Sequence, residues 1–220
     1  MQAQLKAFAD SLKEALGERL ASVILYGSAA KGSHTEGFSD VNVLVVLRAV
    51  SLDDVARASG LARRAGERRY SLVFWSEAEL RRCSDVFPIE YRDILSGYKV
   101  LQGGDALAGL AVDERNMRHQ LEFELRSKLL RLRAGWPEVQ GDKTALAKAL
   151  APAGASFARL LEEARGLPGF SLPKDAGRAF EECRKLKGAE SRPGLADLEK
   201  LYADVHHAAE MVARAVDALD

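Results

Sequence analysis

Apolar residues follow two different spacings in the first half of the chain. They recur every three to four positions from Leu5 to Leu16, which predicts an amphipathic helix that ends near Gly17. Short apolar runs predict buried strands at residues 22–26, 41–47 and 70–75, and a fourth, edge strand at residues 99–102. Further helices are predicted after the capping residues Ser51 and Ser76, and over residues 88–98.

The strand pattern vanishes after about residue 107. Helices are predicted around residues 121–132 and over residues 143–165, 174–187 and 194–219. The last of them carries apolar residues three and four positions apart, a narrow seam for packing against other helices of this chain or of a partner. We therefore predict an α+β fold: a small mixed-sheet domain over residues 1–106, followed by an all-α helical bundle domain over residues 107–220.

Charge and hydropathy exclude several classes of protein. The 220 residues carry 32 Lys and Arg against 32 Asp and Glu, a formal net charge of +0. A general nucleic-acid coat or a protein that binds acidic membranes needs an excess of positive charge. No apolar run reaches the roughly 18 residues of a membrane-spanning helix, and charged residues interrupt the N-terminal stretch where a signal peptide needs an apolar run. We expect a cytoplasmic protein.

Candidate chemistry is concentrated between the first two predicted strands. The first strand ends in Gly27-Ser28, Lys31-Gly32 follows, and Ser39-Asp40 precedes the second strand. A phosphate-binding P-loop is excluded, because that loop requires Lys and then Ser or Thr directly after its second glycine, and Ser33-His34 stands there. Gly27 lets the backbone approach a phosphate, Ser28 and nearby amide groups can donate hydrogen bonds to it, and Lys31 adds positive charge.

Taken together, these residues resemble the signature of the DNA polymerase β-type nucleotidyltransferase superfamily. In layout the chain is similar to the small bacterial branch that includes kanamycin nucleotidyltransferase and the antitoxin-type minimal domains, in which a helical bundle follows the catalytic domain. The resemblance implies a nucleoside triphosphate (NTP) as substrate or ligand, with ATP the first candidate, and Mg²⁺ bound by carboxylates. It implies that the nucleotide is bound by Gly27, Ser28, Lys31 and Ser39, and that Asp40 binds the metal and takes part in catalysis.

Two of the expected carboxylates are missing. Residues i and i+2 of a strand share a face, so position 42 should act with Asp40, but it is Asn42. The third acid of the family normally lies on the strand assigned here to residues 70–75, where Ser71 stands in its place. Mg²⁺ prefers charged oxygen ligands, and a hydroxyl is a weak general base. We expect a weak metal site unless a remote acid such as Glu90 completes it.

Three functions remain open at this point. The favoured one is a degenerate nucleotidyltransferase-like protein that binds a nucleotide or a partner with little or no transfer. The second is an active, metal-dependent enzyme that moves a nucleoside monophosphate onto a hydroxyl of a small molecule, an RNA or a protein. The third is a helical protein-interaction module of antitoxin type, which associates with a protein partner or with itself through the seam of residues 198–219.

Overall fold

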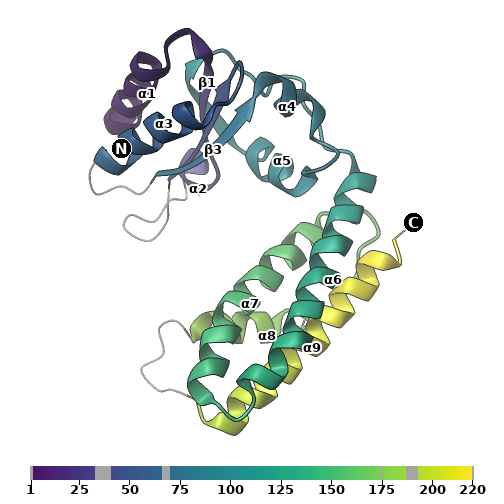
Figure 1. The fold of residues 1–220 in the computed structure, drawn as a ribbon. Helices are drawn as coiled ribbons and strands as arrows, with labels where there is room; N and C mark the ends of the chain where they lie inside the picture. The colour runs from purple at the N-terminus through teal and green to yellow at the C-terminus, as the bar shows by residue number, and fades with distance from the viewer. Residues whose placement is uncertain (1, 33–40, 66–69, 174, 187–192, 220) are drawn as a thin grey trace. The chain divides into compact units, whose positions relative to one another are not determined.

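The chain folds into two compact units, Met1–Asp113 and Glu114–Asp220. The computed structural model describes residues 2–32, 41–65, 70–173, 175–186 and 193–219, and Figure 1 shows their helices and strands. A mixed sheet with helices forms the first unit and helices alone form the second, so the α+β class predicted from the sequence is confirmed. Within these residues, no helix is long and apolar enough to cross a membrane.

A four-stranded sheet is the frame of the first unit. Its strands are β1 (Leu20–Tyr26), β2 (Val41–Leu47), β3 (Tyr70–Ser76) and β4 (Tyr98–Gly103), in the order β3-β2-β1-β4. Strand β1 is antiparallel to both of its neighbours, whereas β2 and β3 are parallel. The end of β1 therefore lies at the same edge of the sheet as the starts of the other three strands.

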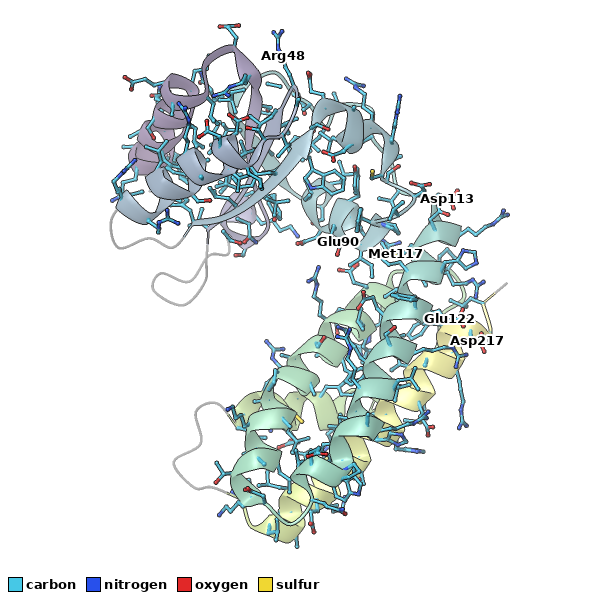
Figure 2. The ribbon with its side chains drawn as sticks, viewed as in Figure 1. Arg48, Glu90, Asp113, Met117, Glu122 and Asp217 are labelled. Atoms are coloured by element: carbon cyan, nitrogen blue, oxygen red, sulfur yellow. The ribbon has the colours of Figure 1, made fainter. Side chains whose placement is uncertain are left out.

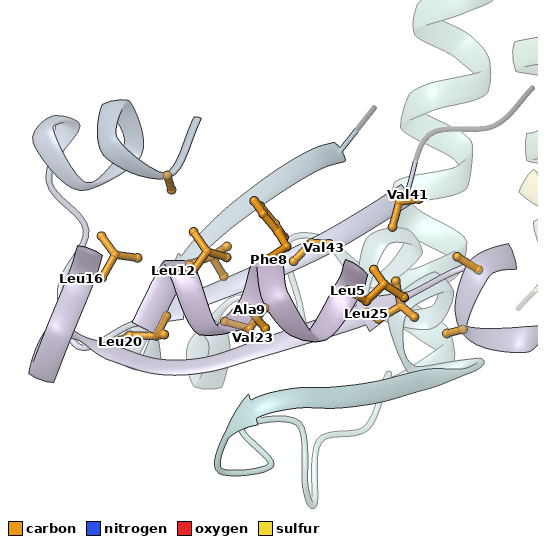
Figure 3. Packing of buried hydrophobic residues seen from close by; sticks show 14 of the residues in the cluster. Leu5, Phe8, Ala9, Leu12, Leu16, Leu20, Val23, Leu25, Val41 and Val43 are labelled. Atoms are coloured by element: carbon orange, nitrogen blue, oxygen red, sulfur yellow. The ribbon is translucent and has the colours of Figure 1, made fainter. Parts of the chain in front are cut away.

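Helices cover both faces of this sheet. The elements are α1 (Gln2–Leu16), η1 (Gly17–Arg19), α2 (Ser28–Lys31), α3 (Leu52–Arg64), α4 (Glu77–Arg82) and α5 (Pro88–Leu95). On one face, Leu5, Phe8 and Leu12 of α1 pack against odd-numbered residues of the two central strands, such as Val23 and Val43 (Figure 3).

The opposite face is covered by α4 and α5. There Leu80, Tyr91 and Ile94 share a cluster with the even-numbered residues Ile24 and Leu44. The same cluster takes in residues 106–112, which is why the first unit extends to Asp113. Both central strands are thus buried on both faces, as their almost uninterrupted apolar sequences require.

The described residues of the second unit form four helices. They are α6 (Glu114–Val139), α7 (Lys143–Arg165), α8 (Arg178–Lys185) and α9 (Leu195–Asp217). The apolar seam predicted near the C-terminus lies on α9, where Leu198, Val205 and Val212 are buried among the other helices of the unit. Packing within the chain therefore accounts for this seam.

Two predicted helices are shorter in the structure. The helix expected over residues 88–98 ends at Leu95, because a Ser96-Gly97 turn follows and Tyr98 already pairs with Tyr26 of β1. The helix expected over residues 174–187 is described only over Arg178–Lys185. For α5, local spacing predicted the helix, but strand pairing sets where it ends.

Two glycines inside long helices should respond oppositely to substitution by alanine. A Cβ at Gly154 of α7 would lie 2.2 Å from Cys183 Cβ of α8, whereas one at Gly135 of α6 would meet only the Tyr202 hydroxyl, at 3.7 Å. We expect Gly154→Ala to lower the free energy of unfolding by about 1–3 kcal/mol through overpacking. The matched Gly135→Ala should raise it by about 0.5–1 kcal/mol, because alanine favours the helix. Urea unfolding followed by circular dichroism measures both, and equal effects of the two variants would contradict the close contact between α7 and α8.

Candidate functional site

A tight turn joins β1 to α2 at one edge of the sheet. Gly27 has φ 73° and ψ −152°, a conformation that residues with a Cβ rarely adopt. The Gly27 carbonyl oxygen accepts hydrogen bonds from the amides of Ala30 (3.1 Å) and Lys31 (3.2 Å), which starts the single turn of α2. Ser28 opens this helix, and Gly32, with φ 77°, ends it. The predicted phosphate-contacting residues Gly27, Ser28 and Lys31 thus share one short turn.

Four side chains form a row across the sheet next to this turn. Register pairs Tyr26 of β1 with Asn42 of β2 on one side and with Tyr98 of β4 on the other, and it pairs Asn42 with Ser71 of β3. Paired residues of neighbouring strands point to the same face, here the face covered by α4 and α5. We call Ser71, Asn42, Tyr26 and Tyr98 the rim row. The two positions where the family resemblance implies carboxylates, 42 and 71, are direct neighbours in it.

Asn42 also touches the turn. A Cβ built on Gly27 would lie 3.1 Å from Asn42 Nδ2, so the Asn42 amide lies against the Gly27 backbone. Gly27 is therefore required twice: for its positive φ and for the close approach of Asn42. The structure brings together three of the residues singled out from the sequence, because Ser71 is the cross-strand neighbour of Asn42.

Lys31 is held from the far side of the turn by a residue that the sequence analysis did not single out. A Cβ on Gly97 would lie 2.8 Å from Lys31 Cγ and 3.0 Å from Lys31 Cε, so the aliphatic stem of Lys31 rests on Gly97. Ser96-Gly97 is an ordinary turn signal between a helix and a strand. Nothing local in it indicates that a lysine some 65 residues earlier lies over the glycine, because β4 reaches β1 only through the tertiary fold.

Two predicted site residues, Ser39 and Asp40, lie outside the described residues. Asp40 directly precedes Val41, the first residue of β2. Among the residues that the structure does describe, no group of three or more His, Cys, Asp or Glu side chains could hold a metal ion. Asn42 and Ser71 provide one amide and one hydroxyl, neutral donors that suit Mg²⁺ poorly. The side chains of the rim row therefore do not form a two-metal site by themselves.

Three of the acids that follow β3 in sequence, Glu79, Glu90 and Asp105, have different environments. Glu79 accepts hydrogen bonds from the Ser76 amide (2.8 Å) and the Ser76 hydroxyl (2.7 Å) in a capping box, and these bonds lower its pKa. Asp105 accepts hydrogen bonds from the Tyr98 hydroxyl (3.0 Å) and the Leu107 amide (3.1 Å), and its contact raises the pKa of Tyr98. Glu79 and Asp105 are thus engaged in local structure.

Glu90 differs from both, because it is exposed in the first turn of α5 (Figure 2). Its neighbours Ile89 and Tyr91 are both buried, and Tyr91 belongs to the cluster that also contains Tyr26 of the rim row. Glu90 therefore lies in an exposed helix turn on the face of the sheet that carries the rim row.

Comparison with known proteins agrees with this geometry. Residues 5–93 match the family model of the nucleotidyltransferase domain, a span that includes the Gly27 turn, Asn42, Ser71 and Glu90. A search of curated proteins found no sequence similar enough to count as a relative.

Solved structures provide a match to the fold. One of them is a crystal structure of spectinomycin adenyltransferase AAD(9) from Enterococcus faecialis with ATP and spectinomycin, at a TM-score of 0.55 and 12% sequence identity, covering 98% of each chain. At this identity the likeness concerns the fold. The mixed sheet, the glycine turn and the family match over residues 5–93 agree in giving the first unit the fold of a nucleotidyltransferase domain.

Proposed function

We propose that the first unit binds a nucleoside triphosphate at the Gly27 turn and transfers its nucleotide slowly or not at all. One observation carries this proposal: Asn42 lies against Gly27 and beside Ser71, so neutral side chains stand where transfer needs carboxylates. Binding of phosphate and catalysis of transfer depend on different groups, and the chain keeps the first set while it lacks most of the second.

The turn offers three features that suit a triphosphate. Gly27 has no side chain to keep a phosphate away, and Ser28 brings a hydroxyl and a helix start that can donate hydrogen bonds. Lys31 adds a positive charge whose position is restricted by Gly97. ATP is the first nucleotide to test, because the fold-related spectinomycin adenyltransferase was crystallised with it.

Transfer needs more than this turn. In a two-metal mechanism the ions stabilise the attacking and leaving oxygens, and carboxylates hold the ions in place. An amide oxygen carries no charge to share between two cations, and a serine hydroxyl cannot accept a proton near neutral pH as a carboxylate can. Each 1.36 kcal/mol of lost transition-state stabilisation lowers the rate about tenfold, so two missing carboxylates suffice to suppress transfer strongly.

Calorimetric titration with ATP and Mg²⁺ tests nucleotide binding. The wild-type chain should bind ATP at one site, and Gly27→Ala should weaken binding at least tenfold, because its Cβ faces Asn42 and the backbone can no longer adopt φ 73° without strain. Gly17→Ala is the matched control: Gly17 also has a positive φ, of 58°, but its Cβ would meet nothing within 4 Å. The proposal fails if the wild type does not bind ATP, or if both variants bind it equally well.

Restoring a carboxylate tests why transfer is weak. We expect Asn42→Asp to strengthen Mg²⁺-dependent ATP binding by about tenfold and to raise the rate of pyrophosphate release, since a charged oxygen returns to the position beside Gly27. Asn42→Ala, which removes the oxygen without adding charge, should do neither. A wild-type rate well above about one turnover per minute would show that the site is not degenerate.

An active nucleotidyltransferase is the second candidate, and the position of Glu90 is the observation that favours it. Helix α5 packs on β1, with Tyr91 buried in the same cluster as Tyr26, so Glu90 is placed on the face of the sheet that carries the rim row. Under this hypothesis, Asp40 and Glu90 provide the metal-binding carboxylates that Asn42 and Ser71 cannot provide. The acceptor would be a hydroxyl group of a small molecule, an RNA or a protein.

Two conservative variants separate the candidates. If the chain is active, Asp40→Asn and Glu90→Gln should each lower the rate of pyrophosphate release by a hundredfold or more while ATP binding changes far less. Glu77→Gln is the matched control, because Glu77 is an exposed first-turn acid of α4, the neighbouring helix. Activity that survives in both Asp40→Asn and Glu90→Gln would show that these two carboxylates do not complete the site.

A further inference from the structure

The helical second unit contains a cavity of about 450 Å³ between α6, α7 and α9, which lie side by side in Figure 1. A cavity of this size lies within the usual range for small-molecule sites, roughly 300–1,000 Å³. Every lining residue belongs to the second unit, so the cavity is independent of the nucleotide site proposed for the first.

Small side chains make the hollow. Gly135 of α6 faces Ala149 and Ala153 of α7 across it, where larger residues would fill a helical core. A Cβ at Gly135 would meet only the Tyr202 hydroxyl, at 3.7 Å, so this side of α6 opens into the cavity. The space follows from the choice of residues and not from a break in the helices.

Its inner wall is apolar and held in place. Tyr202 of α9 is buried, donates its hydroxyl proton to the Leu132 carbonyl oxygen, and lies 5.0 Å from the Trp136 ring, centroid to centroid. Phe157 is buried and stacks on Phe180, with centroids 5.5 Å apart. Because these rings are fixed by their own contacts, they cannot swing in to close the space, which leaves an apolar surface for a ligand.

One part of the wall is positively charged. Lys128 and Arg131 of α6 line the cavity, and no acid is among the described residues that line it. Lys128 pairs with Glu124 at 3.2 Å, but Arg131 makes no ion pair with any other described residue. An anionic group on a bound molecule would form an ion pair with Arg131, while the rest of the molecule contacts the apolar wall.

A neighbouring cavity of about 300 Å³ also has an arginine in its wall, but the charge of that arginine is compensated. It is lined by Arg133, Trp136, Tyr202, Ala203 and His206. Arg133 donates hydrogen bonds to His206 Nε2 (2.9 Å) and to Glu210 Oε1 (2.6 Å), so its charge is already compensated. Of these two, the larger cavity is therefore the one in which a cation that makes no ion pair with a described residue lies beside an apolar wall.

We propose that this cavity binds a small amphiphilic anion, a molecule with an aromatic or acyl body and one carboxylate, sulfonate or phosphate group. The apolar body contacts the wall around Tyr202 and Phe157, and the anionic group pairs with Arg131. The site is separate from the nucleotide turn, and it gives the helical unit a ligand of its own.

A matched pair of fluorescent probes tests the proposal on the full chain with ATP and Mg²⁺ at saturation, so that the nucleotide turn is not available. Anilinonaphthalene sulfonate has the apolar body and the anion, whereas phenylnaphthylamine has the same rings without charge. Both should bind at one saturable site. Arg131→Gln should weaken binding of the sulfonate about three- to fivefold, as for a partly exposed ion pair, and leave the neutral probe unchanged.

Filling the cavity gives the second arm. Gly135→Leu should weaken both probes at least tenfold, whereas the control Gly135→Ala leaves most of the space and should change binding little. Thermal melting checks that each variant is folded. If Gly135→Leu does not fold, Ala153→Leu fills the cavity from the opposite helix, α7, and is tested in its place. The proposal is overturned if the wild type shows no saturable binding, if a folded filling variant binds like the wild type, or if Arg131→Gln affects both probes equally.

Discussion

The contact between Gly27 and Asn42 is the constraint on which the candidate site depends. Strand β1 must stop, turn and start α2 within one residue, and only a glycine allows the positive φ that this turn has. The same absence of a side chain lets Asn42, from the antiparallel neighbour β2, come within 3.1 Å of the position where a Cβ would stand. The turn proposed to contact phosphate and the strand expected to carry carboxylates are thereby held together, and the rest of the rim row follows from strand register.

The chemistry of this edge differs from what its geometry suggests. Its backbone has the fold of a nucleotidyltransferase domain, with the turn and the two positions expected to carry carboxylates side by side. The side chains at those positions are an amide and a hydroxyl, which can hold a ligand by hydrogen bonds but cannot share charge with metal ions. Retained geometry with altered charge is a physical basis for proposing nucleotide binding ahead of nucleotide transfer, and it makes the placement of Glu90 the feature that supports the enzymatic alternative.

The second unit shows a different balance between packing and space. Around Gly154 the helices α7 and α8 approach so closely that no Cβ fits, whereas around Gly135 a helix glycine faces open volume. Two glycines in similar helical settings thus do opposite things, one allowing close packing and the other leaving a cavity. The fixed rings of Tyr202 and Phe157, together with Arg131, which makes no ion pair with another described residue, support the proposal that this cavity is a binding site and not a packing defect.

Much of this molecule was predictable from local sequence. The apolar runs at 22–26, 41–47 and 70–75 predicted the first three strands, the helix over Lys143–Arg165 was predicted with its observed bounds, and the Gly27-Ser28 signature predicted the superfamily. Such features depend on residues close together in the chain, so spacing and residue type are enough to reveal them. Three features of the molecule were decided only by the tertiary structure: the pairing of Asn42 with Ser71, the contact of the Lys31 side chain with Gly97, and the cavity beside Tyr202. Each of these joins residues from distant segments, and strand register and helix packing, which bring them together, are properties of the whole fold.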